Sequence, residues 1–275
     1  MARAPVYFFS HGGPTFMYAD RDDDGTADIG AFNALKKMGK EIVETIKPKA
    51  VVVFSAHWQS SPNTIEVNTA EKTDLIYDFY GFPEFMYKET YPNVGSKNVS
   101  QQVITALQAA GIKAKGVNRG LDHGVWVPFK IAFGKGQELT VPVVQVSLFK
   151  SDDPRQHVAL GKALSSLRDE NILIIGSGMT VHNLREMGHY WGSVAPYAKK
   201  FDEMLKQAVV SETGSSREDA LASLIKTPEA NKSHPTKEHL LPIYIASGAA
   251  YDDSAVRVYT AQTSSLAWGE YKFGN

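Results

Sequence analysis

The sequence contains no cysteine among its 275 residues, which excludes disulfide bonds, thiolate metal sites and a cysteine nucleophile. No apolar run approaches the roughly 18 residues that a membrane-spanning helix needs. The formal net charge of −1 gives no sign of a nucleic-acid or membrane-surface partner. Residues 1–5 lead directly into an apolar segment without a signal-peptide pattern. We therefore expect a cytoplasmic protein that binds neither nucleic acid nor membranes.

The amino-acid composition is typical of a globular protein, with 43% hydrophobic and 21% charged residues. Continuous apolar runs at 50–54, 141–147 and 172–175 are typical of strands in a sheet that is covered on both faces. Helical periodicity at 29–46, 97–110 and 154–169 separates these runs. No repeat or linker interrupts the pattern. We predict an α/β fold in which residues 1–275 form one domain, with a central, largely parallel or mixed sheet flanked by helices.

Histidines follow several of the predicted strands. His11 follows the strand at 5–9, His57 follows the strand at 50–54, and His182 comes four residues after the segment 172–178. In open α/β sheets, sites form outside the carboxyl ends of the strands, so these side chains are expected to converge. His123 and His239 lie in segments flanked by glycine or proline and are further candidates.

Imidazole without thiolate suits zinc, copper, nickel or non-heme iron. No HExxH spacing is present to define a metal. From spacing alone, a histidine-rich metal site and a set of unrelated turn histidines both remain open. We expect His123 to be exposed in a loop over 120–124, and His157 to be a surface residue in the first turn of its helix. The aromatic stretch at 75–91 predicts either a packed irregular loop or a wall over an apolar ring.

Five segments together resemble a known family. They are SHGGP (10–14), SAHW (55–58), GLDHG (120–124), GSGMTVHNL (176–184) and HPTKEHLLP (234–242). In this order they are similar to the class III extradiol ring-cleaving dioxygenases, and most similar to the DOPA 4,5-dioxygenase branch. The stretch YDFYGFPEFMY (77–87) also fits that branch.

The resemblance implies an Fe(II) site that Zn(II) can also occupy, with a small-molecule catechol and O2 as substrates and a ring-opened semialdehyde as product. It implies His11, His57 and His239 as metal ligands, although distant members use a carboxylate as the third ligand and Glu238 is adjacent. His182 matches the family's acid/base residue and is a further ligand when substrate is absent. His123 matches a pocket histidine that hydrogen-bonds substrate or oxygen. His234 is left outside this set.

Two other functions remain as alternatives: a non-catalytic, Memo-like phosphopeptide-binding protein, and a zinc hydrolase on the same ligands. The HNL motif at 182–184 and the DHG motif at 122–124 favour the enzyme. We expect a small catechol with a polar side chain. The predicted aromatic wall comprises Tyr77, Phe79, Tyr80 and Phe82, with Trp58 beside a ligand. Candidate partners for a substrate carboxylate are Arg119, Arg185 and Lys237.

Overall fold

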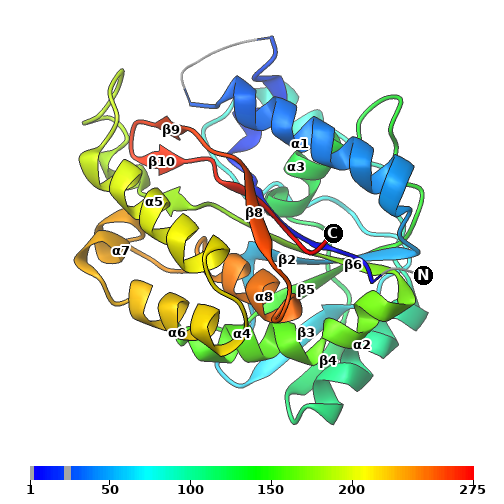
Figure 1. The fold of residues 1–275 in the computed structure, drawn as a ribbon. Coiled ribbons are helices and arrows are strands. Elements are labelled where there is room, and N and C mark those ends of the chain that lie inside the picture. The colour runs from blue at the N-terminus through cyan, green and yellow to red at the C-terminus, as the bar shows by residue number, and fades with distance from the viewer. Residues whose placement is uncertain (1–2, 22–25) are drawn as a thin grey trace.

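The computed structural model describes residues 3–21 and 26–275, and over these residues the chain builds one large sheet and one small sheet. The large sheet has the order β4-β3-β5-β2-β6-β1-β11-β8 (Figure 1). Its strands are β1 (Val6–Ser10), β2 (Ala50–Gln59), β3 (Thr64–Asn68), β4 (Lys113–Val117), β5 (Val143–Leu148), β6 (Ile172–Gly178), β8 (Ala255–Tyr259) and β11 (Glu270–Phe273). The small sheet joins β7 (Val181–His182), β10 (Leu266–Ala267) and β9 (Gln262–Thr263).

The centre of the large sheet is parallel. Strand β6 pairs in parallel with both β1 and β2, and β2 pairs in parallel with β5. Antiparallel pairs flank this centre, β3 with β5 on one side and β1 with β11 and β11 with β8 on the other. The predicted mixed α/β architecture is confirmed, and the carboxyl ends of β1, β2 and β6 meet at one edge.

Helices cover both faces of the large sheet. Figure 1 shows α1 and α3 on one side and α4, α6 and α8 on the other. The bounds are α1 (Ile29–Glu41), α2 (Lys97–Ala109), α3 (His123–Ala132), α4 (Pro154–Ala163), α5 (Pro196–Val210), α6 (Gly214–Leu224), α7 (Pro228–Ser233) and α8 (Leu241–Ala249). Short 3₁₀ segments span Pro14–Tyr18, Glu84–Lys88, Ser165–Glu170 and Leu184–Glu186, and a π turn spans Ile42–Ile46.

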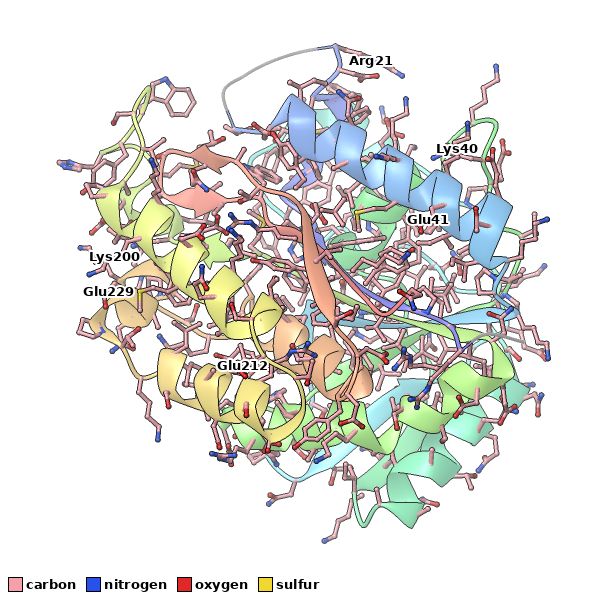
Figure 2. All side chains as sticks on the ribbon, viewed as in Figure 1. Arg21, Lys40, Glu41, Lys200, Glu212 and Glu229 are labelled. Atoms are coloured by element: carbon pink, nitrogen blue, oxygen red, sulfur yellow. The ribbon has the colours of Figure 1, made fainter. Side chains whose placement is uncertain are left out.

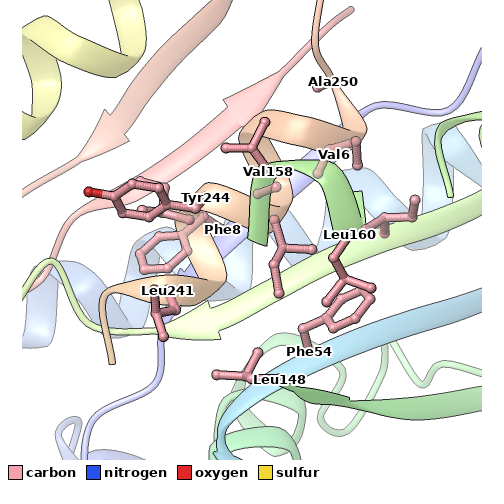
Figure 3. Close-up of a cluster of buried hydrophobic side chains, with 14 of the residues drawn as sticks. Val6, Phe8, Phe54, Leu148, Val158, Leu160, Leu241, Tyr244 and Ala250 are labelled. Carbon is pink, nitrogen blue, oxygen red and sulfur yellow. The ribbon is translucent and has the colours of Figure 1, made fainter. Parts of the chain in front are cut away.

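The alternation of strand side chains divides the core into two layers. Val6 and Phe8 of β1 pack with α4, α5 and α8, whereas Tyr7 and Phe9 pack with α1 and α3. Figure 3 shows the first layer, where Leu241 and Tyr244 of α8 and other side chains cover Phe8. Burial on both faces explains why the central strands are continuously apolar.

Side-chain caps fix where several helices begin. Asp28 accepts a hydrogen bond from the backbone N–H of Ala31 at 2.7 Å, which satisfies a donor that the first turn of α1 leaves unpaired. Ser96 caps α2 in the same way, through the N–H of Val99 at 3.2 Å. The helix predicted over 29–46 is α-helical to Glu41 and ends through the π turn.

Two predictions about histidines are wrong. His123 is not in an exposed loop but is the first residue of α3, with only 6% of its surface exposed. Gly124 and Pro128 gave the misleading loop signal, although proline is disfavoured rather than forbidden within a helix. His157 is fully buried, because it lies on the side of α4 that carries the buried residues Leu160 and Gly161. Its ring packs edge-on against Phe149 and its Nδ1 lies 2.8 Å from the carbonyl oxygen of Asp153.

Many charged side chains project from the outer faces of the helices, whereas Asp202 of α5 and Arg217 of α6 are buried. Figure 2 shows Lys40 on α1, and Lys200 of α5 near Glu229 of α7, with which it forms an ion pair. Among the residues that the structure describes, no helix combines the length and the apolar character needed to cross a bilayer.

Candidate metal centre

Three imidazoles meet at the carboxyl edge of the parallel strands. His11 directly follows β1, His57 lies near the end of β2, and His239 lies two residues before α8. The Nε2 atom of His57 lies 3.1 Å from Nε2 of His11 and 3.2 Å from Nε2 of His239. Nitrogen ligands that bind one metal ion at about 2.1 Å are about 3.0–3.4 Å apart. The separations therefore suit a single metal ion between the three rings.

The orientation of His11 depends on Ser177 of β6. The Ser177 hydroxyl donates its hydrogen to the carbonyl oxygen of Gly124, and its oxygen lies 3.1 Å from Nδ1 of His11. A hydroxyl has one hydrogen, so Ser177 can only accept from His11. This places the proton of His11 on Nδ1 and leaves the Nε2 lone pair directed at the other two histidines.

The Gly124 carbonyl is available to Ser177 because of Pro128 in α3. A proline has no N–H and cannot donate to the carbonyl four residues earlier, which here is that of Gly124. Gly124 also needs to be glycine, because a Cβ there would lie 2.4 Å from Oγ of Ser55 and 2.9 Å from Cδ2 of His57. The start of α3 is thus packed directly against the histidine cluster.

The other two rings each have a carboxylate near Nδ1, which is hydrogen-bonded for His239 and a longer charge contact for His57. Nδ1 of His239 lies 3.1 Å from Oε1 of Glu238, and Nδ1 of His57 lies 3.4 Å from Oδ2 of Asp78. Acceptors at the second ring nitrogen are usual for histidines that bind metals, since they fix the tautomer and the ring plane. Glu238 contacts the Nδ1 side of His239, away from the nitrogen that faces His57.

Asp78 is a site residue that the sequence reasoning missed. Its Oδ1 accepts hydrogen bonds from Nδ1 of His123 at 2.8 Å and from the backbone N–H of His123 at 3.0 Å. Burial alone would raise the pKa of Asp78, but these hydrogen bonds and the nearby His57 lower it. The available signal was a carboxylate between two rings of the aromatic stretch, in the sequence Tyr77-Asp78-Phe79.

His182 lies beside the three converging nitrogens. Its ring stacks on that of His239, with centroids 3.6 Å apart and planes inclined by 12°. Among the described residues, the group that contains His11 and His57 has His239, not His182, as its third member. Burial, followed by the effects of His57 and His123, lowers the pKa of His182 to about 3. The ring is therefore neutral at pH 7, with a free lone pair on one nitrogen.

Burial also lowers the pKa values of the three converging histidines, His11, His57 and His239. Neutral imidazole is the form that binds metals, so the environment favours the ligand state. His234 is buried apart from them, and its Nε2 lies 2.9 Å from the carbonyl oxygen of Thr180.

A cavity of about 390 Å³ opens in front of the histidines. Its lining combines five histidines, the turn after β1, part of the aromatic stretch, and apolar side chains near the small sheet. These residues are His11, Gly12, Gly13, Pro14, Thr15, Thr26, His57, Asp78, Phe79, Tyr80, Phe82, His123, Met179, His182, Leu184, Met187, His239 and Leu266.

The turn at Gly12 is shaped by a conformation and a contact that only glycine permits. Gly12 has φ of +58°, and a Cβ there would lie 2.6 Å from the ring of Trp268. The SHGGP segment can therefore pass close over Trp268 and still place His11 at the base of the cavity.

The predicted aromatic wall is correct in part. Phe79, Tyr80 and Phe82 line the cavity, but Tyr77 and Trp58 do not. Tyr77 packs against Trp126, with ring centroids 5.5 Å apart, so it belongs to the core. The aromatic stretch is therefore both a packed loop and a cavity wall. The three candidate partners for a substrate carboxylate, Arg119, Arg185 and Lys237, are also absent from the lining.

The model of the family described as the catalytic LigB subunit of aromatic ring-opening dioxygenase matches residues 5–272. The chain belongs to this family. The resemblance seen in the five sequence segments is thereby confirmed, and the chain is an extradiol ring-opening dioxygenase.

Relatives of this dioxygenase extend over nearly its whole length. It is 34% identical to a 4,5-DOPA dioxygenase extradiol-like protein of Schizosaccharomyces pombe, over 89% of this chain and 84% of the relative. It is 33% identical to a 4,5-DOPA dioxygenase extradiol of Beta vulgaris, over 98% and 96% of the two chains. An uncharacterised Escherichia coli K12 protein of known structure superposes with a TM-score of 0.76 at 26% identity, covering 99% and 100% of the two chains.

Proposed function

We propose that this dioxygenase uses Fe(II) to open the ring of a small catechol with O2, which gives a ring-opened semialdehyde. The observation that supports the proposal is the convergence of three imidazoles, with Nε2 of His57 3.1 Å from that of His11 and 3.2 Å from that of His239. Nδ1 of His11 and of His239 is hydrogen-bonded, and Nδ1 of His57 faces the Asp78 carboxylate. These donors fit a metal ion in both spacing and tautomer.

In this proposal, His11, His57 and His239 hold the metal. Fe(II) on such a ligand set has open positions for catechol and O2, and it supplies the electron exchange between them. Zn(II) fits the same nitrogens but does not change its oxidation state. Glu238 orients His239 from the Nδ1 side and is not itself a ligand.

The remaining histidines handle protons and position the substrate. The neutral ring of His182 takes a proton from a catechol hydroxyl, which the diol loses when it binds as a chelate. His123 has its Nδ1–H directed at Asp78, so Nε2 is the nitrogen that is available to a molecule in the cavity. The apolar side chains around the cavity pack against the flat ring and exclude water from it.

The cavity also bears on the phosphopeptide-binding alternative. No lysine or arginine from the described part of the chain lines it. Recognition of phosphorylated peptides characteristically uses arginine clusters. This lining therefore supports catalysis rather than phosphopeptide binding as the role of the site.

The test compares metals on one preparation. Metal-free protein is reconstituted without oxygen with Fe(II) or Zn(II), mixed with 4-methylcatechol, and followed by oxygen electrode and by the yellow absorbance of the semialdehyde. We expect one O2 consumed per catechol with Fe(II) alone, and none with resorcinol, whose hydroxyls are not adjacent. Absence of oxygen uptake by the Fe(II)-replete protein with every catechol offered would refute the proposal, and ester hydrolysis by the Zn(II) form would favour a hydrolase.

A further inference from the structure

The wall of the cavity above the histidines is almost free of charge. Among the described lining residues, Asp78 is the only acidic side chain, and no lysine or arginine accompanies it. Two threonine hydroxyls, of Thr15 and Thr26, lie 2.8 Å apart and provide neutral polarity. The apolar part of the wall comprises Pro14, Phe79, Phe82, Met179, Met187 and Leu266.

Of the three cations considered as partners for a substrate carboxylate, Arg119 and Lys237 contact other groups and Arg185 lies outside the cavity lining. The Arg119 guanidinium lies 2.9 Å from Oδ2 of buried Asp122 and stacks 4.5 Å over the ring of Trp58. Nζ of Lys237 donates to Oδ1 of Asn231 at 2.9 Å and to the carbonyl oxygen of His234 at 2.8 Å. Arg185 is exposed and lies outside the lining.

A negatively charged substituent would meet an unfavourable environment in this cavity. It would lose hydration against apolar side chains without gaining an opposite charge. The Asp78 carboxylate, 24% exposed and held by His123, would add like-charge repulsion. An unpaired charge of this kind is a common means of rejecting a competing ligand.

We propose that the substrate is a catechol whose ring substituent carries no carboxylate, such as a short alkyl, hydroxyalkyl or amide group, and not a carboxylic acid or an amino acid. This inference rests on the proposed function. A volume of about 390 Å³ is near the lower end of ligand pockets, which suits one ring with a short substituent.

The test uses two catechols of nearly equal shape, 3,4-dihydroxyphenylacetamide and 3,4-dihydroxyphenylacetate. With the Fe(II) enzyme we expect kcat/KM to be at least about tenfold higher for the amide, a difference typical of one unfavourable charge contact. Titration of the Zn(II) form measures binding without turnover and should show the same preference in Kd. Equal kcat/KM and Kd for the two catechols, or a preference for the acid, would overturn the inference. Turnover of the acid by the Fe(II) enzyme would still support the proposed function.

A gain-of-charge variant tests the physical cause. Leu184 lines the cavity and is 58% exposed, so it tolerates a longer polar side chain. Leu184→Arg should raise kcat/KM for the acid relative to the amide several-fold, whereas Leu184→Gln, similar in polarity but neutral, should not. An unchanged ratio in Leu184→Arg would overturn the electrostatic explanation. Absence of oxygen uptake with both catechols in metal-replete protein would overturn the proposed function and the inference together.

Discussion

Oγ of Ser177 lies 3.1 Å from Nδ1 of His11 while its hydrogen is directed to the Gly124 carbonyl that Pro128 leaves unpaired. A proline within α3 thus influences the tautomer of a proposed ligand that follows β1. We predict that Ser177→Ala lowers metal affinity by about 10–100-fold, because the ring of His11 loses the acceptor that orients it. Competition with a chelator measures this affinity.

Ser247→Ala is the matched control for this variant. Ser247 is also buried, and its hydroxyl has no hydrogen-bond partner among the described residues. We expect its metal affinity to equal that of the wild type. If Ser177→Ala also matched the wild type, the orienting role of Ser177 would be wrong.

Asp78 is predicted to position His123 and His57 rather than to hold the metal. Asp78→Asn keeps the size of the side chain but weakens the acceptor at His123 Nδ1, so kcat/KM should fall by about 10–100-fold with most of the metal retained. Asp78→Glu should recover part of the loss. Glu84→Gln is the control. It makes the same kind of change at a carboxylate of the same segment whose side chain is 82% exposed, and it should leave kcat/KM unchanged. A complete loss of metal in Asp78→Asn would instead identify Asp78 as a ligand.

The third ligand can be identified by a pair of adjacent substitutions. His239→Ala removes the nitrogen that lies 3.2 Å from His57 Nε2, so the protein should lose its metal and its activity. Glu238→Gln keeps an acceptor oxygen near His239 Nδ1 and should reduce metal affinity by no more than about 100-fold. Metal content after dialysis distinguishes the two, and the reverse order of effects would assign Glu238 as the ligand.

Local sequence patterns were enough to predict two of the converging histidines. His11 and His57 follow continuous apolar runs, and parallel strands bring their carboxyl ends together, so their convergence was foreseeable. The mixed sheet followed from the same runs. The resemblance placed the third ligand at His239, but spacing alone could not separate it from the adjacent Glu238. His239 faces His57 and Glu238 lies on its Nδ1 side, which supports His239, and the ligand set stays a prediction.

The remaining part depends on contacts between distant segments. Ser177 is 166 residues from His11, and Asp78 is 45 residues from His123, so no periodicity relates the partners. The start of α3 at His123 was missed because glycine and proline normally interrupt helices, whereas here the freed carbonyl has a side-chain donor. His157 was misplaced because its burial is determined by Phe149, outside its own helix.

His182 is predicted to contribute to turnover rather than to metal binding. His182→Ala should lower kcat by about 10²–10⁴-fold, the usual effect of removing a general acid–base group, while metal content stays near that of the wild type. His123→Ala should have a smaller effect, because that ring positions substrate or oxygen. His189→Ala, on the exposed segment after the site, is the control and should be neutral. Near-normal turnover of His182→Ala would exclude the role.

His234 should make the fold sensitive to acid. Burial lowers its pKa to about 3, whereas in the unfolded chain the value is about 6.5. Between these values the unfolded state binds a proton that the folded state does not, so stability falls as the pH falls through this window. His234→Gln, which cannot titrate, should lose less stability than the wild type, by up to about 1.4 kcal/mol per pH unit. Urea unfolding of both metal-free proteins from about pH 7.5 to pH 5 measures the difference, and parallel stability curves would show that His234 is protonated in the folded protein.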